Sequence, residues 1–246
     1  MHAAPLTLAG TPLLLDLAGA VVDPASRTLA VADLHLEKGS AYAAGGRLLP
    51  PYDTAATLAA LHRLTRHYRP KSVVCLGDSF HDGDGPARLA PRDRTLLTRL
   101  VGAHDWIWVA GNHDPALPGS LGGRHVVEWR LGNIVFRHDA GDTGAAGTPA
   151  GEVSGHFHPR ASVSTRGRRV TARCFVSDGR RLILPAFGAY TGGLNALDPA
   201  IAGLMRPAFR VFLLGRERLF RFNRNQLQPD PPRLEEGSRR LEGRAG

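Results

Sequence analysis

Five short motifs in this sequence carry side chains of the kinds that bind transition-metal ions. In chain order they are Asp33-Leu34-His35, Gly77-Asp78-Ser79-Phe80-His81-Asp82, Gly111-Asn112-His113-Asp114, Arg137-His138 and Gly155-His156-Phe157-His158. Carboxylate oxygen and imidazole nitrogen together suit manganese, iron or zinc better than calcium or magnesium. Two such ions about 3.5–4 Å apart can hold a phosphate ester and activate water to attack it. The ordered set therefore predicts a two-metal site that hydrolyses phosphate esters.

Taken singly, each motif has an ordinary structural explanation. An Asp-x-His sequence is common by chance, and a lone histidine after a strand, such as His138, is often a structural or surface residue. The motif from Gly111 to Asp114 could be a simple turn, because glycine and asparagine both tolerate left-handed backbone. The Gly-His-x-His motif is more specific, since it brings two imidazoles together in one short segment. The combination of all five motifs in this order is what indicates a metal centre.

The first three motifs each follow a predicted buried strand. Apolar runs at residues 28–32, 71–76 and 105–110 predict the strands, and helical patterns occupy residues 53–67 and 91–101. Asp53 is the expected N-cap of the first helix, and Pro91 the first residue of the second. Strands that alternate with helices predict an α/β fold with parallel strands. Because the carboxyl ends of parallel strands meet at one edge of a sheet, the motifs are expected to converge there.

The second half of the chain predicts short strands separated by turns. They are expected at residues 124–130, 133–137, 162–165, 170–177 and 181–184, with a last hairpin that pairs 209–214 with 218–222. A segment rich in Gly, Ala and Thr, residues 139–151, is expected to be a mobile loop. From about residue 226, Pro, Glu and Arg replace the apolar pattern, which indicates a disordered tail. The expected organisation is one domain, 1–225, followed by a tail, 226–246.

The charge and the cysteines of the chain restrict its partners and its location. The 246 residues carry a net charge of +9, which favours a polyanionic partner such as nucleic acid. The alternative is that an arginine-rich protein carries this charge for solubility alone. Cys75 and Cys174 are the only cysteines, too few for a disulfide framework, and this favours a reducing cytoplasm. No signal peptide and no membrane-spanning run is expected.

The ordered motifs resemble those of the calcineurin-like metallophosphoesterase superfamily, over about residues 29–193. The resemblance implies an α/β sandwich of two mixed sheets flanked by helices, with two divalent metal ions at the strand ends. It implies seven ligands: Asp33, His35 and His158 on one ion, Asn112, His138 and His156 on the other, and Asp78 as a bridge between them.

Three further residues receive catalytic roles from the same resemblance. His113 would lie beside the scissile phosphate, where it can protonate the leaving oxygen, and Asp114 could orient its imidazole. Many members of the superfamily have aspartate where this chain has His81. The Gly-Asp-x-Phe-His sequence resembles the nuclease branch that includes SbcD-type repair nucleases, in which this histidine contacts the phosphate. The alternative for His81 is a hydrogen-bonding residue that braces the turn.

Longer stretches resemble the ligase-associated DNA damage response endonucleases of the PdeM type. These stretches are residues 33–39, 77–82, 106–114 and 185–195, and the likeness runs from about residue 14 to 199. It implies a phosphodiesterase that uses manganese, with iron or zinc as alternatives, and that cuts DNA internally, with single-stranded DNA as the expected substrate. It also implies a bacterial repair setting, with DNA ligase and helicase machinery as partners.

The placement of the arginines agrees with a nucleic-acid partner. Residues 160–181 contain seven arginines against one acid, Asp178. Among them Arg166, Arg168 and Arg169 lie on a predicted hairpin and are expected to follow the DNA backbone. The alternative is that alternate residues of this hairpin simply face solvent.

Aromatic residues divide into two groups. Trp106 and Trp108 lie in a buried-looking strand, so they are expected to be core residues. Phe187 and Tyr190 lie in a Gly-rich segment and could stack on a base.

Two other functions are compatible with the same motifs. The first is a phosphoesterase that acts on nucleotides or other small molecules, which a closed and small pocket would favour. The second is a binding scaffold without enzymatic activity. All seven ligand positions and His113 are filled, which argues against a scaffold.

Overall fold

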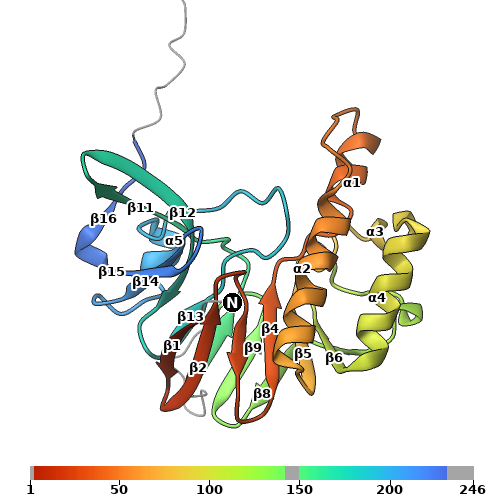
Figure 1. Ribbon diagram of the computed structural model, residues 1–246, viewed down its shortest axis with the longest axis horizontal. Helices are drawn as coiled ribbons and strands as arrows, with labels where there is room; N and C mark the ends of the chain where they lie inside the picture. Colours follow the sequence, from red (N-terminus) through yellow and green to blue (C-terminus); the bar gives the residue numbers. More distant parts are fainter. Residues whose placement is uncertain (1–2, 142–149, 232–246) are drawn as a thin grey trace, which may run out of the picture.

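Two mixed β-sheets pack face to face in the computed structural model, which describes residues 3–141 and 150–231 (Figure 1). The first sheet has the order β1 (Ala3–Leu8), β2 (Thr11–Asp16), β3 (Val21–Asp23), β4 (Thr28–Ala32), β5 (Ser72–Leu76), β6 (Asp105–Val109), β7 (Arg124–Val126). Strands β4 to β7 run parallel, whereas β1 to β4 form antiparallel pairs. The parallel part is the one that the sequence predicted.

The second sheet is built from the C-terminal half of the chain. Its order is β15 (Leu219–Asn223), β14 (Arg210–Leu214), β12 (Arg168–Ser177), β13 (Arg181–Ile183), β10 (Gly151–Ser154), β9 (Ile134–Arg137), β8 (Glu128–Leu131). Strand β11 (Arg160–Thr165) pairs with β12, and the short β16 (Leu227–Gln228) pairs with β11. Strands β9, β10 and β13 run parallel, so this sheet also presents carboxyl ends at one edge.

The helices lie outside the sandwich. Helices α2 (Asp53–Tyr68) and α4 (Pro91–Ala103) cover the outer face of the first sheet, as the right side of Figure 1 shows. The shorter helices are α1 (Lys38–Ala44), α3 (Gly85–Arg88) and α5 (Pro199–Ala202), and single 3-10 turns occur at Gly119–Leu121 and Arg224–Gln226. None of the helices in the described part of the chain is long and apolar enough to cross a membrane.

Side chains that alternate between the two faces of a strand allow the first sheet to contribute to two hydrophobic cores. In β4, Leu29 and Val31 pack against the helices, whereas Ala30 and Ala32 face the second sheet. The same period of two places Trp106 in the helix-covered core, because successive side chains of a strand point to opposite faces. Burial of each large apolar side chain contributes roughly 1.5–3 kcal/mol. Trp106 and Trp108 are each only 1% exposed, so the prediction that they are core residues is confirmed.

Two predicted elements differ from the structure. The strand expected at residues 124–130 is two strands, β7 and β8, which belong to different sheets because the chain crosses between the sheets at the exposed Val127. The predicted N-cap role of Asp53 is wrong. Tyr52 occupies the N-cap, and Asp53 is instead buried within the first turn, where Oδ2 accepts a hydrogen bond from Gly39 N at 3.0 Å.

The predicted boundaries of the loop and the tail are also affected. The packed chain continues past residue 225, since β16 pairs with β11, so the domain ends a few residues later than predicted. Residues 232–246 of the predicted tail lie outside the described residues, as do residues 142–149 of the predicted loop. Residue 151 of that loop begins β10.

Candidate metal centre

The predicted metal-binding motifs follow five parallel strands, three in one sheet and two in the other. The loops after β4, β5 and β6 carry Asp33 with His35, then Asp78, then Asn112. The loops after β9 and β10 carry the three remaining predicted ligands, His138, His156 and His158. The structure brings all seven predicted ligand residues to this one edge of the sandwich, as the sequence motifs led us to expect.

The backbone of these loops is unusual in the same way in both sheets. Asp33, His35, Asp78, His156 and His158 all have positive φ, between 42° and 70°. This left-handed conformation costs of order 1–3 kcal/mol for a residue with a Cβ and tends to occur at functional sites. The conformation turns each side chain away from its strand direction and toward the shared edge.

Two glycines make room for the cluster. Gly77 has φ +68°, and a Cβ on it would lie 2.3 Å from His138 Nδ1. A Cβ on Gly111 would lie 2.1 Å from the backbone nitrogen of Asp78. Such distances are far below van der Waals contact, so a side chain at either position would displace a predicted ligand.

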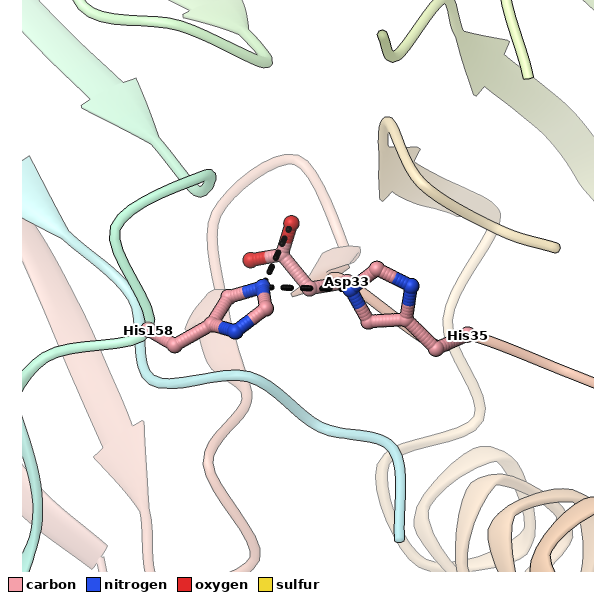
Figure 2. A group of neighbouring side chains, drawn as sticks. All are labelled: Asp33, His35 and His158. Carbon is pink, nitrogen blue, oxygen red and sulfur yellow. Dashed lines mark hydrogen bonds and ion pairs between the residues drawn. The ribbon is translucent and has the colours of Figure 1, made fainter. Parts of the chain in front are cut away.

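Asp33, His35 and His158 form the first group of donor atoms (Figure 2). The Nε2 atoms of the two histidines are 3.1 Å apart, and His158 Nε2 is 3.6 Å from Asp33 Oδ1. The rings point toward each other from loops of different sheets. Two unprotonated imidazole nitrogens at this distance repel each other unless a proton or a cation lies between them.

His138 is at the centre of the second group. Its Nε2 is 2.9 Å from Asn112 Oδ1 and 3.1 Å from His156 Nδ1. Its Nδ1 is 3.1 Å from the carbonyl oxygen of Leu76. Because a carbonyl can only accept, the proton resides on Nδ1 and the lone pair of Nε2 faces the site, which is how metal-binding histidines are usually held.

Asp78 lies between the two groups. Its Oδ2 is 3.9 Å from His35 Nε2 and 3.5 Å from His138 Nε2. The other oxygen, Oδ1, accepts a hydrogen bond from the backbone N–H of His113 at 3.0 Å, which fixes the carboxylate. This position suits a carboxylate that serves both groups.

The charge state of His35 also suits metal binding. Burial lowers the pKa of His35 to about 2, with further contributions from the nearby His158 and His113. The imidazole is therefore neutral at physiological pH and offers a lone pair. Its Nδ1 is buried with no hydrogen-bond partner among the described residues. The mixed oxygen and nitrogen donors, their spacing and the neutral imidazole all fit two divalent cations.

His113 and His81 lie beside the two groups of predicted metal ligands. Their rings stack with centroids 5.5 Å apart, and the His113 ring also meets His35 edge to face at 5.3 Å. His113 Nδ1 is 2.9 Å from the carbonyl oxygen of His81, to which it donates. His81 Nδ1 makes no hydrogen bond within the described part of the chain. The imidazole of His81 therefore does not brace the turn through a hydrogen bond of Nδ1.

The predicted role of Asp114 is wrong. Its Oδ2 accepts a hydrogen bond from Phe80 N at 3.0 Å, and the His113 ring is oriented by the His81 carbonyl instead. Burial raises the pKa of Asp114 to about 6, partly offset by the Phe80 hydrogen bond. Asp114 therefore holds the loop after β5 rather than the imidazole.

A hydrogen-bonded chain that the sequence did not predict supports the turn after His81. Arg88 Nη2 donates to both oxygens of Asp82, at 2.7 and 2.8 Å. Arg88 Nε donates to Ser40 Oγ at 2.9 Å, and Ser40 donates to Glu37 at 2.7 Å. Glu37 and Ser40 lie at the start of α1, so this chain ties α1 and α3 to the turn. Arg88 comes from a short helix without any motif, so no sequence signal marked it.

The predicted nucleic-acid residues lie elsewhere. Arg166, Arg168 and Arg169 are exposed at the tip of the β11–β12 hairpin. The tip begins five residues beyond Arg160, which is roughly 17 Å along an extended strand. Arg169 Nη2 donates to the carbonyl of Pro229 at 2.6 Å, so part of this charge holds the C-terminal segment.

Comparisons with known proteins identify the family of the chain. The calcineurin-like phosphoesterase family matches residues 26–167, more than half of the chain. No protein with a curated description matches. The crystal structure of Pseudomonas putida nuclease MPE is similar, with 30% identity, coverage of 90% of this chain and 100% of that one, and a TM-score of 0.68. Yfce, a phosphoesterase from E. coli, aligns at 15% identity over 79% of this chain and 97% of its own, with a TM-score of 0.41. A family match over this length and a site of this composition show that the chain belongs to the calcineurin-like phosphoesterase family and is a metal-dependent phosphoesterase.

Proposed function

We propose that this protein is a manganese-dependent phosphodiesterase that cuts single-stranded DNA internally. The observation that carries the proposal is the convergence of seven oxygen and nitrogen donors, beside His113 and His81, in a chain that is 30% identical to a nuclease over nearly its whole length. Two divalent cations, when bound, supply Lewis acidity at the phosphate and make water more acidic. Manganese suits this donor set, and iron and zinc are the alternatives.

Some residues of the site would bind the cations, and others would transfer a proton or contact the phosphate. Asp33, His35 and His158 would hold one cation, Asn112, His138 and His156 the other, and Asp78 both. His113 donates through Nδ1 to the His81 carbonyl, so its Nε2 is the atom that would carry a proton to the leaving oxygen. His81, stacked on His113, is placed to contact a phosphate oxygen.

The open form of the site favours a polymer over a small molecule. Asn112 and His113 are exposed, and a recess of about 390 Å³ lined in part by Asn112, Arg137 and His138 opens beside them. An exposed edge of this kind can accept a long strand, whereas small-molecule sites enclose most of their ligand. The net charge of +9 supports the same substrate class.

The setting of the activity is a further part of the proposal. A bacterial DNA-repair role, with DNA ligase and helicase machinery as partners, is supported by the resemblance to PdeM-type endonucleases. A reducing cytoplasm is supported by the two cysteines, Cys75 and Cys174, which are both free and buried.

A closed circle of single-stranded DNA tests the proposal, since it offers no ends. The circle is incubated with manganese, with bis-p-nitrophenyl phosphate and a mononucleotide as parallel substrates. Nicking that requires manganese and is lost in Asp78→Ala supports the proposal, because this change removes the carboxylate shared by both groups. Hydrolysis of the small esters with an intact circle would refute DNA cleavage and favour the small-molecule alternative.

A further inference from the structure

A second recess lies next to the metal centre, on the side of α2. Its volume is about 330 Å³, within the range of pockets that bind small ligands. Three elements line it, namely helix α2, strand β12 through Arg173, and the loop of residues 187–191.

The loop of this recess is bonded directly to the backbone of a predicted ligand. Phe187 N donates to the carbonyl of Ala32 at 2.8 Å, and Gly188 N donates to the carbonyl of Asp33 at 3.1 Å. A Cβ on Gly188 would lie 2.0 Å from the carbonyl oxygen of Leu34. Gly188, which lines the recess, therefore lies directly against the backbone of Asp33 and Leu34.

The lining combines aromatic, small and cationic groups. Tyr190 is 43% exposed, whereas Phe187 is only 6% exposed. On the α2 side the lining includes the small side chains of Ala56 and Ala60. Arg173 Nη1 donates to the carbonyl of Ala186, and within the described residues no other acceptor is bonded to its guanidinium. An aromatic wall with a free cationic donor is the chemistry that binds a base together with its phosphate.

Tyr190 is also held in a costly backbone conformation. Its φ is +60°, in the left-handed region. A non-glycine residue there costs of order 1–3 kcal/mol and persists only where its surroundings impose it. On the neighbouring residue, Ala189 N donates to Thr57 Oγ1 at 3.2 Å, which ties the loop to α2 and fixes the position of Tyr190.

We propose that this recess binds one unpaired nucleobase of the DNA strand, next to the phosphate that is cut. Tyr190 stacks on the base, and Arg173 contacts a neighbouring phosphate oxygen. The proposal rests on the proposed DNA cleavage and adds a physical reason why single-stranded DNA would be preferred over duplex DNA. A base in a duplex is already stacked and paired, so it must be unstacked before it can enter such a recess.

Oligonucleotides with one abasic site test the recess. A series places the abasic site at successive positions around a preferred cleavage position, and the products are mapped by length. Loss of one stacked base is expected to lower cleavage by about 5- to 100-fold at one fixed offset and little elsewhere. Equal cleavage at every offset would overturn the proposal.

Tyrosine variants provide the matched comparison. Tyr190→Ala should lower kcat/KM on intact single-stranded DNA by a similar factor, become insensitive to the abasic site, and lose far less on bis-p-nitrophenyl phosphate. Tyr190→Trp should restore the sensitivity, since indole also stacks. Tyr52→Ala removes another exposed tyrosine, 68% exposed and outside the recess, and should behave as wild type.

The outcomes separate this proposal from the proposed function. A wild-type protein that cleaves DNA, with a Tyr190→Ala variant that keeps the wild-type response to abasic sites, would overturn only the base recess. A wild-type protein that hydrolyses bis-p-nitrophenyl phosphate but no DNA would overturn both.

Discussion

The edge that carries the seven predicted metal ligands and the tip of the β11–β12 hairpin both bear side chains with predicted functions, but the two regions differ in how firmly these side chains are held. At the edge, Asp33, Asp78 and His138 are buried and held by backbone hydrogen bonds. At the tip, Arg166 and Arg168 are exposed and their side chains make no hydrogen bond or ion pair with the described residues. A residue type indicates chemistry only where neighbours fix its position.

Other arginines of the basic run are used by the fold. Arg160 forms an ion pair with Asp230 at 2.5 Å, and a hydrogen bond from Asn195 together with Arg160 lowers the pKa of that carboxyl. Arg181 is buried beside Glu152. Residues 160–181 carry a net charge of +6, and part of this charge therefore stabilises the fold through internal ion pairs. This leaves the hairpin with less charge for a nucleic acid than the sequence indicated.

His113→Ala should give the largest effect of the changes that leave the predicted metal ligands intact. Loss of a general acid lowers turnover on DNA by about 10²–10⁴-fold. The loss should be much smaller on bis-p-nitrophenyl phosphate, because its leaving group departs without a proton. Metal content, measured on the purified variant, should stay at the wild-type level. Equal losses on the two substrates would argue against proton transfer by His113.

Arg88→Ala should give an intermediate effect. The Arg88 side chain holds Asp82, and the adjacent His81 carbonyl orients His113, so we expect kcat on DNA to fall roughly 10-fold with little change in KM. Arg88→Lys keeps the charge but cannot bond Asp82 and Ser40 together, so it should restore little activity. Arg92→Ala, an exposed arginine at the start of α4, is the control. A change in KM alone would indicate that Arg88 acts on substrate binding.

The double change Arg166→Gln and Arg168→Gln should give the smallest effect. If these side chains contact phosphates, removal of two contacts weakens binding of single-stranded DNA several-fold and lowers the slope of log K against log salt by about 1.4. Fluorescence anisotropy at several salt concentrations, with the Asp78→Ala protein as a non-cleaving background, measures both. An unchanged slope would show that these arginines face solvent and do not contact phosphates.

The sequence predicted the first half of the molecule better than the second. Strands β4, β5 and β6 are largely apolar runs followed by predicted ligands, so their pattern marks both the element and the candidate site. Strands β7 and β8 could not be separated, because the chain changes sheets at Val127 without a glycine or proline to mark it. The seven donors were brought together as expected, whereas their roles as ligands stay predictions.

The hydrogen-bond partners of individual side chains could not be predicted from the sequence. The family resemblance implied that Asp114 orients the His113 imidazole, but the loop turns Asp114 toward Phe80. Arg88 lies outside every motif, and only the fold brings α3 against α1. The first case depends on backbone direction over a few residues, and the second depends on tertiary packing between residues 48 apart. Residue types alone encode neither.

The position of the candidate metal centre across the two sheets has a mechanical consequence. His156 N–H already donates to the Asp33 carboxylate, at 3.1 Å to Oδ2, and thus joins the loop after β10 to the loop after β4. His35 and His158, which are 123 residues apart, would share one ion. An ion that cross-links so long a loop removes much of the conformational entropy of the unfolded chain. Chelation should therefore loosen the sandwich from this edge, with amide hydrogens at the ends of β4 and β10 exchanging first.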